Sequence, residues 1–227
     1  MLPDFEASDK KALEFILDKW NLEYCYPLKT EVPVILVKKE GRELVLKIWG
    51  KLIGSFVWGK FIPYNFMEEL GYQLKKESYK KLGVKLNPGE GFEHRTVIYD
   101  SKALRILNQN HVDSVPRREG FTVSKNHYFL LREYIPGKSV SRDNPLPEQE
   151  QKSLAELVET CHSLGVANLD LDNHGHIILG EDNKIKLVDF GSCIFRDSIS
   201  KKGFERYKKV DYYFLDEFLN QQHNFIL

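Results

Sequence analysis

The chain has 227 residues, of which 42% are hydrophobic and 29% charged, and this globular composition excludes a disordered, collagen-like or low-complexity protein. Its 33 basic and 33 acidic side chains give a formal net charge of +0, so electrostatics offers no case for nucleic acid as a partner. The length predicts one domain with additions or two closely joined lobes.

The cysteines and the N-terminus indicate where the protein works. Cys25, Cys161 and Cys193 do not have the paired spacing of a metal site, and so few cysteines favour a reducing compartment. The acidic N-terminal residues do not have the basic-then-apolar order of a signal peptide. No uncharged apolar run reaches the roughly 18 residues that span a membrane. We therefore expect a soluble cytoplasmic protein.

The first part of the chain predicts a helix and then a β-hairpin. Residues 8–20 carry apolar side chains at helical spacing behind a capping Ser or Asp. Residues 32–39 and 42–49 are rich in β-branched and apolar side chains, and Glu40-Gly41 between them is typical of a tight turn. Residues 51–94 begin apolar and aromatic and then become rich in lysine, a pattern that does not settle their structure.

The second part of the chain alternates helical and strand patterns. The expected helices are 96–111, 147–164 and 204–219, and the expected strands are 127–135, 176–179 and 185–190. Antiparallel strands come first and helices dominate later, which predicts a two-lobed α+β architecture.

The residues that carry most of the chemistry lie between positions 162 and 192. The strand pattern at 185–190 ends in Asp189-Phe190-Gly191, and Asp170 lies in a polar loop 19 residues earlier (189 − 170). Upstream, Lys47 lies inside the strand pattern LVLKIW.

This order and spacing resemble the protein-kinase-like superfamily. There, a strand lysine binds the ATP phosphates, a loop aspartate is the catalytic base, and the aspartate of a DFG motif binds magnesium. The resemblance implies that Lys47 binds phosphate, that Asp170 is the base, and that Asp189 is a metal ligand. It also implies ATP and Mg²⁺ (or Mn²⁺) as cofactors.

The resemblance extends to the hinge and to the division into lobes. Residues 131–137 are similar to the hinge, where backbone groups near Glu133 and Ile135 would hold adenine. The implied fold is a single kinase-like domain over residues 1–227. Its N-lobe, residues 1–132, would be an antiparallel sheet with an insertion at about 51–94, and residues 133–227 would form a reduced helical C-lobe.

Three features depart from the usual pattern of the superfamily. The loop triplet reads Asn168-Leu169-Asp170, without the usual arginine, and no glycine-rich loop is present. The position expected to hold an Asn is Gly175, so we interpret the loop as one residue longer, with His176 in the Asn position. His176 would then ligate a metal and favour Mn²⁺, since nitrogen is a softer ligand than oxygen. Alternatively it only shapes the loop, and Asp172 or Asn173 supplies the oxygen.

The departures narrow the resemblance to small bacterial kinases of lipopolysaccharide core sugars (Kdo and heptose kinases) and their RIO-like relatives. Residues 94–121 are similar to the acidic helix and VPR loop of that group. Either Asp100 or Glu77 could pair with Lys47 on chemistry alone, and the resemblance favours Asp100. Only 36 residues follow Gly191 (227 − 191), which is short for an activation segment and a full substrate platform.

Two further side chains have more ordinary interpretations. His162, at the end of a predicted helix, is expected to interact with the helix dipole rather than to act in catalysis. Cys193 is expected to be a small buried residue that fills space.

The expected function is ATP-dependent phosphorylation of a sugar hydroxyl of the lipopolysaccharide inner core. The alternatives are a RIO-like protein serine/threonine kinase and a pseudokinase that binds nucleotide without transfer. Basic residues in 51–85 and 196–209 would hold a phosphorylated glycolipid or an anionic membrane surface, which would place the protein peripherally on the inner face of the cytoplasmic membrane. The sequence leaves the oligomeric state open.

Overall fold

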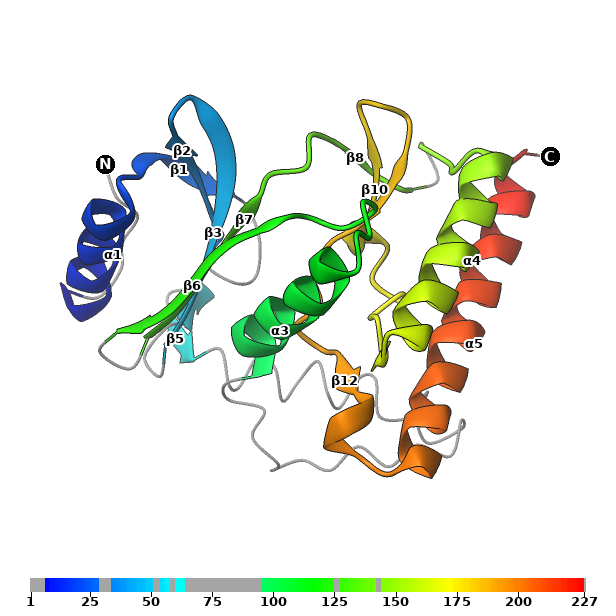
Figure 1. The fold of residues 1–227 in the computed structure, drawn as a ribbon. Coiled ribbons are helices and arrows are strands. Elements are labelled where there is room, and N and C mark those ends of the chain that lie inside the picture. Colours follow the sequence, from blue (N-terminus) through cyan, green and yellow to red (C-terminus); the bar gives the residue numbers. More distant parts are fainter. Residues whose placement is uncertain are drawn as a thin grey trace.

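The structure is a computed structural model. It describes residues 7–28, 34–50, 54–57, 60–63, 95–124, 127–141 and 144–226. Within these ranges, a five-stranded antiparallel sheet with two helices precedes a part built from two long helices and short strands (Figure 1). The fold is therefore mixed α+β, and the predicted class is confirmed.

The five-stranded sheet has the strand order β1-β2-β3-β7-β6. Its strands are β1 (Glu23–Leu28), β2 (Val34–Lys39), β3 (Arg42–Gly50), β6 (Arg118–Ser124) and β7 (His127–Glu133). The predicted hairpin joins β2 to β3, and its turn residues Glu40 and Gly41 have φ angles of 51° and 78°. A two-residue turn with positive φ matches the twist of the flanking strands.

The edge strand β6 is not among the predicted strands. Its alternation of apolar and polar side chains is confined to residues 121–124, and nearly all its residues are half-buried rather than divided between a buried and an exposed face. β6 pairs with β7 along its length. β7 is therefore a central strand, flanked by β3 and β6.

Two helices pack against this sheet. Helix α1 (Ala7–Trp20) buries Ala12, Leu13 and Ile16, and helix α3 (Arg95–Gln109) buries an apolar stripe that includes Leu104 and Leu107. Figure 1 shows α1 and α3 on opposite sides of the sheet, with α3 between the sheet and the later helices. Helix α3 can therefore carry a side chain to both parts of the molecule.

A short hairpin is described within the predicted insertion. Strands β4 (Gly54–Val57) and β5 (Lys60–Pro63) pair antiparallel. The rest of residues 51–94 lies outside the described residues, and so do Glu77 and the lysine-rich part of this segment.

Helices α4 (Glu148–Ser163) and α5 (Lys201–Ile226) lie side by side in the later part of the chain (Figure 1). Small sheets connect them to the rest, with orders β11-β10-β8 and β12-β9. Their strands are β8 (Gly137–Ser139), β9 (Val166–Ala167), β10 (Ile177–Gly180), β11 (Ile185–Leu187) and β12 (Ile194–Phe195). Arg196 donates from Nη2 to the carbonyl of His162 at 2.6 Å, a second hydrogen bond to a carbonyl at the end of α4 that also accepts from the backbone N–H of Gly165.

Candidate active site

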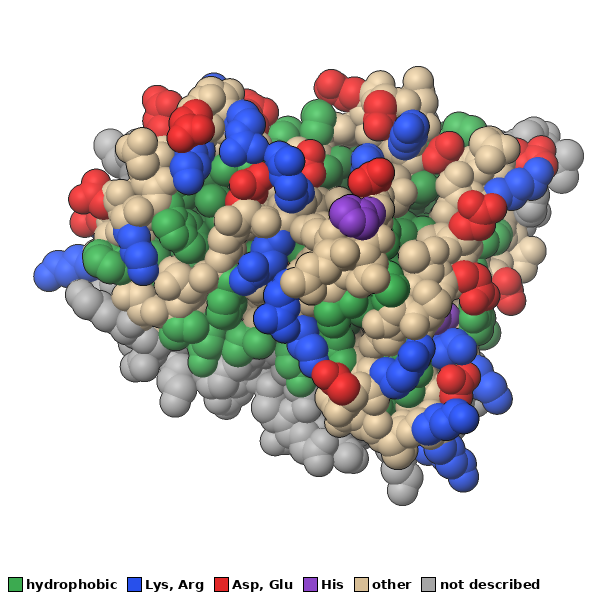
Figure 2. Space-filling view, viewed as in Figure 1, with side chains coloured by type: hydrophobic (Ala, Val, Ile, Leu, Met, Phe, Trp, Pro, Cys, Tyr) green, Lys and Arg blue, Asp and Glu red, His purple; other side chains and the backbone are tan. Residues whose placement is uncertain are grey.

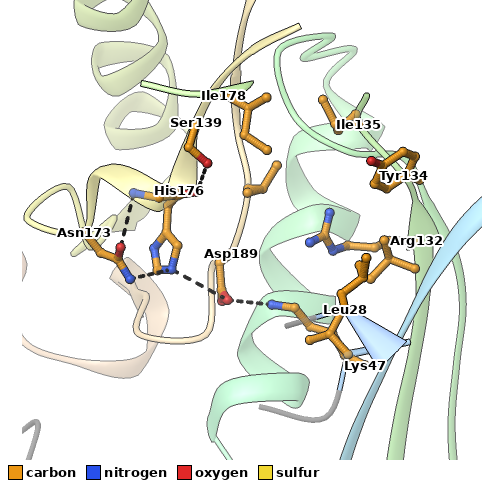
Figure 3. Close-up of a pocket in the computed structure, with 14 residues that line it drawn as sticks. Leu28, Lys47, Arg132, Tyr134, Ile135, Ser139, Asn173, His176, Ile178 and Asp189 are labelled. Atoms are coloured by element: carbon orange, nitrogen blue, oxygen red, sulfur yellow. Dashed lines mark hydrogen bonds and ion pairs between the residues drawn. The ribbon is translucent and has the colours of Figure 1, made fainter. Parts of the chain in front are cut away.

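A cavity of about 500 Å³ opens between the five-stranded sheet and the β10–β11 hairpin (Figure 3). This volume lies within the usual range for small-molecule sites. Its walls are mainly apolar, with charged groups concentrated at Lys47, Arg132 and Asp189. The lining residues are Leu28, Val34, Val45, Lys47, Arg132, Tyr134, Ile135, Ser139, Asn173, Gly175, His176, Ile178, Val188 and Asp189.

Lys47 is held at this cavity by the middle of strand β3. It lies opposite Leu130 of β7 and is only 5% exposed. Its Nζ lies 2.7 Å from Oδ2 of Asp100 and 2.8 Å from Oδ2 of Asp189. A buried ammonium is tolerated where carboxylates pair with it, so two acids from separate elements compensate this one charge.

Asp100 joins helix α3 to both the lysine and the DFG segment. It is 0% exposed, and its Oδ1 accepts a hydrogen bond from the backbone N–H of Phe190 at 3.3 Å. Since its Oδ2 accepts from Lys47, one carboxylate fixes the strand lysine and the backbone just after Asp189. The structure thus places Asp100 beside Lys47.

Asp189 carries an electrostatic signature of a functional site. Burial disfavours its charged form, yet the charges of Lys47 and His176 and the hydrogen bond from Lys47 outweigh burial, and they hold its pKa below the usual range. Its side chain is 32% exposed and faces the cavity. Asp189 is therefore an anionic oxygen donor that a ligand in the cavity can contact.

The β10–β11 hairpin brings His176 next to Asp189. Ile177 of β10 pairs with Leu187 of β11 at the open end of the hairpin. The next residues, His176 and Val188, are therefore adjacent, and the backbone N–H of Val188 donates a hydrogen bond to the carbonyl of His176 at 2.9 Å. The imidazole Nε2 lies 3.9 Å from Oδ2 of Asp189, and Nδ1 lies 3.4 Å from Oδ2 of Asp170. The two predicted carboxylates and the predicted histidine therefore meet in one place.

Asn173 determines which nitrogen of His176 carries the proton. Its Oδ1 accepts from the backbone N–H of Gly175 at 3.2 Å, so its Nδ2 faces His176 Nε2 at 2.9 Å. An amide nitrogen only donates, so Nε2 accepts and the hydrogen lies on Nδ1, towards Asp170. A metal could use the Nε2 lone pair only by displacing Asn173.

Backbone conformation also marks this site. Asn168, Asp170 and Asp189 have φ angles of 60°, 59° and 77°. Residues other than glycine rarely adopt this left-handed backbone conformation, and those that do concentrate at functional sites. Both candidate carboxylates are therefore held in backbone conformations that the surrounding structure must enforce.

Asp211 of helix α5 anchors the loop that carries Asp170. It is 1% exposed, and it accepts from the backbone N–H groups of Asn168 and Leu169, each at 2.7 Å. Its Oδ2 also lies 2.8 Å from Nε2 of His162. Burial raises the pKa of Asp211, and the hydrogen bond and charge of His162 oppose that rise.

His162 lies in the last turn of α4, as expected, and its buried imidazole also bonds Asp211 on the neighbouring helix. Asp211 was not singled out from the sequence, although a signal exists. It shares one face of α5 with the buried Phe214, Leu215 and Phe218, where a lone carboxylate requires a partner. Cys193 is 0% exposed, as expected for a buried filler.

The two hinge residues take different positions. Ile135 lines the cavity. The side chain of Glu133 instead accepts a hydrogen bond from the backbone N–H of Arg117 at 3.0 Å, and its own backbone N–H donates to the carbonyl of Arg117 at 2.8 Å. The carbonyl of Glu133 accepts a long hydrogen bond, 3.5 Å, from Nη1 of Arg132.

The donor set fits a magnesium ion of the kind that binds together with a nucleotide. Among the described residues, no group of three or more His, Cys, Asp or Glu side chains could hold a metal by itself. Mg²⁺ in phosphoryl-transfer sites commonly takes one or two carboxylates and completes its shell with water and substrate phosphates. Asp189 meets that requirement, and His176 lies close enough to contribute.

The metal preference tests the hypothesis that His176 is a ligand. His176→Asn should lower the ratio of Mn²⁺ to Mg²⁺ affinity, because an oxygen donor replaces a nitrogen. Asn173→Ala should raise the ratio, because it frees Nε2 from its present hydrogen bond. Binding of Mn²⁺ measured by electron paramagnetic resonance, with Mg²⁺ as competitor, gives the ratio. An unchanged ratio in both variants would show that His176 does not ligate.

Comparison with known proteins agrees with this geometry at a coarse level. No family model matches the chain. The chain is 27% identical over 176 residues to "Probable serine/threonine-protein kinase KIN1 homolog" of Encephalitozoon cuniculi, covering 65% of this chain and 30% of the relative. It is 32% identical over 91 residues to "Probable serine/threonine-protein kinase fnkB" of Dictyostelium discoideum, covering 35% of this chain and 17% of the relative.

A third relative is bacterial. "Serine/threonine-protein kinase D" of Synechocystis sp. is 27% identical over 86 residues, covering 36% of this chain and 17% of the relative. The chain thus spans less than a third of the length of each of these three proteins. All three are named as serine/threonine-protein kinases, so the likeness is to the protein-kinase-like superfamily. They do not support the lipopolysaccharide subgroup over others.

Proposed function

We propose that this chain is an ATP-dependent phosphotransferase that acts on an alcohol. The observation that carries the proposal is that Lys47 and Asp189 line one cavity and that Asp170 lies next to His176 at its side. Lys47 and Asp189 are 2.8 Å apart, and His176 lies within 3.4 Å of Asp170 and 3.9 Å of Asp189. Phosphoryl transfer needs a cation for the phosphates, a metal-binding carboxylate and a base near the acceptor, and these three residues supply them.

Each residue has a separate task in this proposal. Lys47 neutralises nucleotide phosphates and is aimed by Asp100. Asp170 accepts the proton of the acceptor hydroxyl, and the imidazole of His176 lies beside its carboxylate, with Nδ1 3.4 Å from Oδ2. Asp189, with or without His176, would hold Mg²⁺, which neutralises charge on the transferred phosphoryl group when bound.

A sugar hydroxyl of the lipopolysaccharide core is our proposed acceptor. Only nine residues, 192–200, separate Gly191 from helix α5, and they form strand β12 and a single 3₁₀ turn. So short and packed a connection leaves little backbone against which an extended peptide could lie, and this favours a compact acceptor. The resemblance of residues 94–121 to core-sugar kinases supports the same choice.

The basic face of helix α5 is suited to a phosphorylated glycolipid. Figure 2 shows Lys and Arg side chains gathered over the first half of this helix. The exposed members include Lys201, Lys202, Arg206 and Lys209. Such a cluster attracts anionic headgroups, which supports a peripheral position at a membrane surface. Among the described residues, no helix has the length and apolar character to cross a bilayer.

A protein serine or threonine is the second candidate acceptor. The observation that favours it is that all three relatives are named as serine/threonine-protein kinases. This candidate corresponds to the RIO-like alternative.

Transfer of labelled γ-phosphate tests the proposal. The purified chain is incubated with ATP, Mg²⁺ and either extracted core glycolipid or a generic protein substrate. We expect label in the glycolipid, and none with the Asp170→Asn variant. Label confined to protein would replace the sugar acceptor by the second candidate. Nucleotide binding without transfer to either acceptor would indicate a pseudokinase and overturn the proposal.

A further inference from the structure

Arg132 is a buried cation in the cavity that none of the roles above uses. It lies near the end of β7, is 7% exposed and lines the cavity (Figure 3). Its Nε is buried and has no hydrogen-bond partner. A buried guanidinium donor without a partner is costly, so its presence implies an acceptor that arrives with a ligand.

The sheet fixes the direction of this side chain. Arg132 lies opposite Val45 of β3, and directly paired residues project from the same face of a sheet. Val45 also lines the cavity, so both side chains reach it from that face. The long bond from Nη1 to the carbonyl of Glu133 is weak at 3.5 Å. Among the described residues, no ion pair joins Arg132 to a carboxylate.

Three acceptors could in principle satisfy Arg132: Asp189, a nucleotide phosphate or the edge of a nucleotide base. The charge of Arg132 helps to lower the pKa of Asp189, but among the described residues no ion pair joins the two, and Asp189 is already paired with Lys47 at 2.8 Å. Phosphates would gather where Lys47 and Asp189 lie. Arg132 instead belongs to the strand that runs directly into Tyr134 and Ile135, which line the cavity beyond it.

The apolar walls of the cavity suit a base in that region. Val34 and Val45 come from the sheet, and Ile178 and Val188 from the hairpin beneath it. A planar base between these side chains would present its polar edge to the end of β7. The edge of a nucleotide base is therefore the acceptor that best suits Arg132.

Resting on the proposed phosphotransferase function, we infer that Arg132 reads the edge of the purine and gives the cavity a preference for a 6-carbonyl base. Guanine presents two acceptors there, O6 and N7, and arginine binds this pair in a bidentate manner. Adenine presents an amino donor at position 6, which faces a donor-only guanidinium.

Equilibrium binding of ATP, GTP and ITP analogues that cannot be hydrolysed tests this inference. ITP differs from ATP by carrying a carbonyl in place of the 6-amino group and, with it, a hydrogen on N1. We expect the wild-type protein to bind GTP and ITP at least as tightly as ATP. Arg132→Met should shift the GTP-to-ATP affinity ratio towards ATP by about tenfold, the lower range for one bidentate base contact. Arg105→Met, on the exposed side of α3, is the control and should leave the ratio unchanged.

The outcomes separate this inference from the function on which it rests. A wild-type preference for ATP over both GTP and ITP would overturn it, even if the Arg132 variant did not fold. An equal loss of affinity for all nucleotides in Arg132→Met would indicate a phosphate contact and also overturn it. Base discrimination without any phosphoryl transfer would sustain the role of Arg132 and overturn only the proposed activity. Failure to bind any nucleotide would overturn both.

Discussion

Asp170→Asn is expected to lower the rate of phosphoryl transfer by at least about 100-fold, the usual scale of general-base catalysis. The amide keeps the size of the side chain but cannot accept the proton of the acceptor hydroxyl. Nucleotide affinity should remain within about twofold, because the variant leaves the ion pairs of Lys47 with Asp100 and Asp189 intact. Single-turnover transfer and equilibrium nucleotide binding measure the two effects separately.

Glu181→Gln is the matched control for this variant. It removes a carboxylate at the exposed β10–β11 turn and should change neither rate nor affinity. A transfer rate in Asp170→Asn equal to that of this control would remove Asp170 from the mechanism.

Asp211→Asn is expected to destabilise the protein by about 3 kcal/mol. The buried carboxylate accepts from Asn168, Leu169 and His162, all at 2.7–2.8 Å. Hydrogen bonds to charged groups are worth about 1.5–3 kcal/mol each, and a donor left without its acceptor in the interior adds a desolvation cost. An amide oxygen can replace part of this set, so the loss should fall near the value of one or two bonds.

Chemical denaturation of Asp211→Asn and Asp216→Asn measures this loss. Asp216 lies on the exposed face of the same helix, and its variant should stay within about 0.5 kcal/mol of wild type. Transfer should also slow in Asp211→Asn, since the loop that positions Asp170 loses its anchor. Equal unfolding free energies for the two variants would show that Asp211 is not a structural anchor.

The parts of the fold that could be predicted from the sequence are those that depend on residues close together in the chain. The hairpin at Glu40-Gly41 and helix α4 follow from turn residues and apolar spacing, which depend on near neighbours alone. Strand β6 was missed because it is an edge strand whose side chains are nearly all half-buried, and its pairing with β7 is a tertiary property.

The residues of the candidate site fall into the same two groups, those recognisable from the local sequence and those that depend on tertiary contacts. Lys47, Asp170 and Asp189 could be identified because each lies in a recognisable strand or loop context. The roles of Asp211 and Arg132 depend on contacts between elements far apart in the chain. Asp211 lies 42 residues from Leu169, whose N–H it accepts, and Arg132 faces the cavity only because β7 pairs with β3. An acidic residue on an apolar helix face and an arginine within an apolar strand were nevertheless visible signals of burial.

The central claim is that the cavity holds a metal-bound nucleotide with its phosphates at Lys47 and Asp189. Nucleotide affinity measured by calorimetry with and without Mg²⁺, for wild type and Asp189→Asn, tests it most directly. The control is Asp182→Asn, at the exposed β10–β11 turn. The account predicts that Mg²⁺ strengthens binding by wild type and by the control, and that Asp189→Asn loses this gain because it removes a charged oxygen ligand. A gain from Mg²⁺ that survives unchanged in Asp189→Asn would contradict the account.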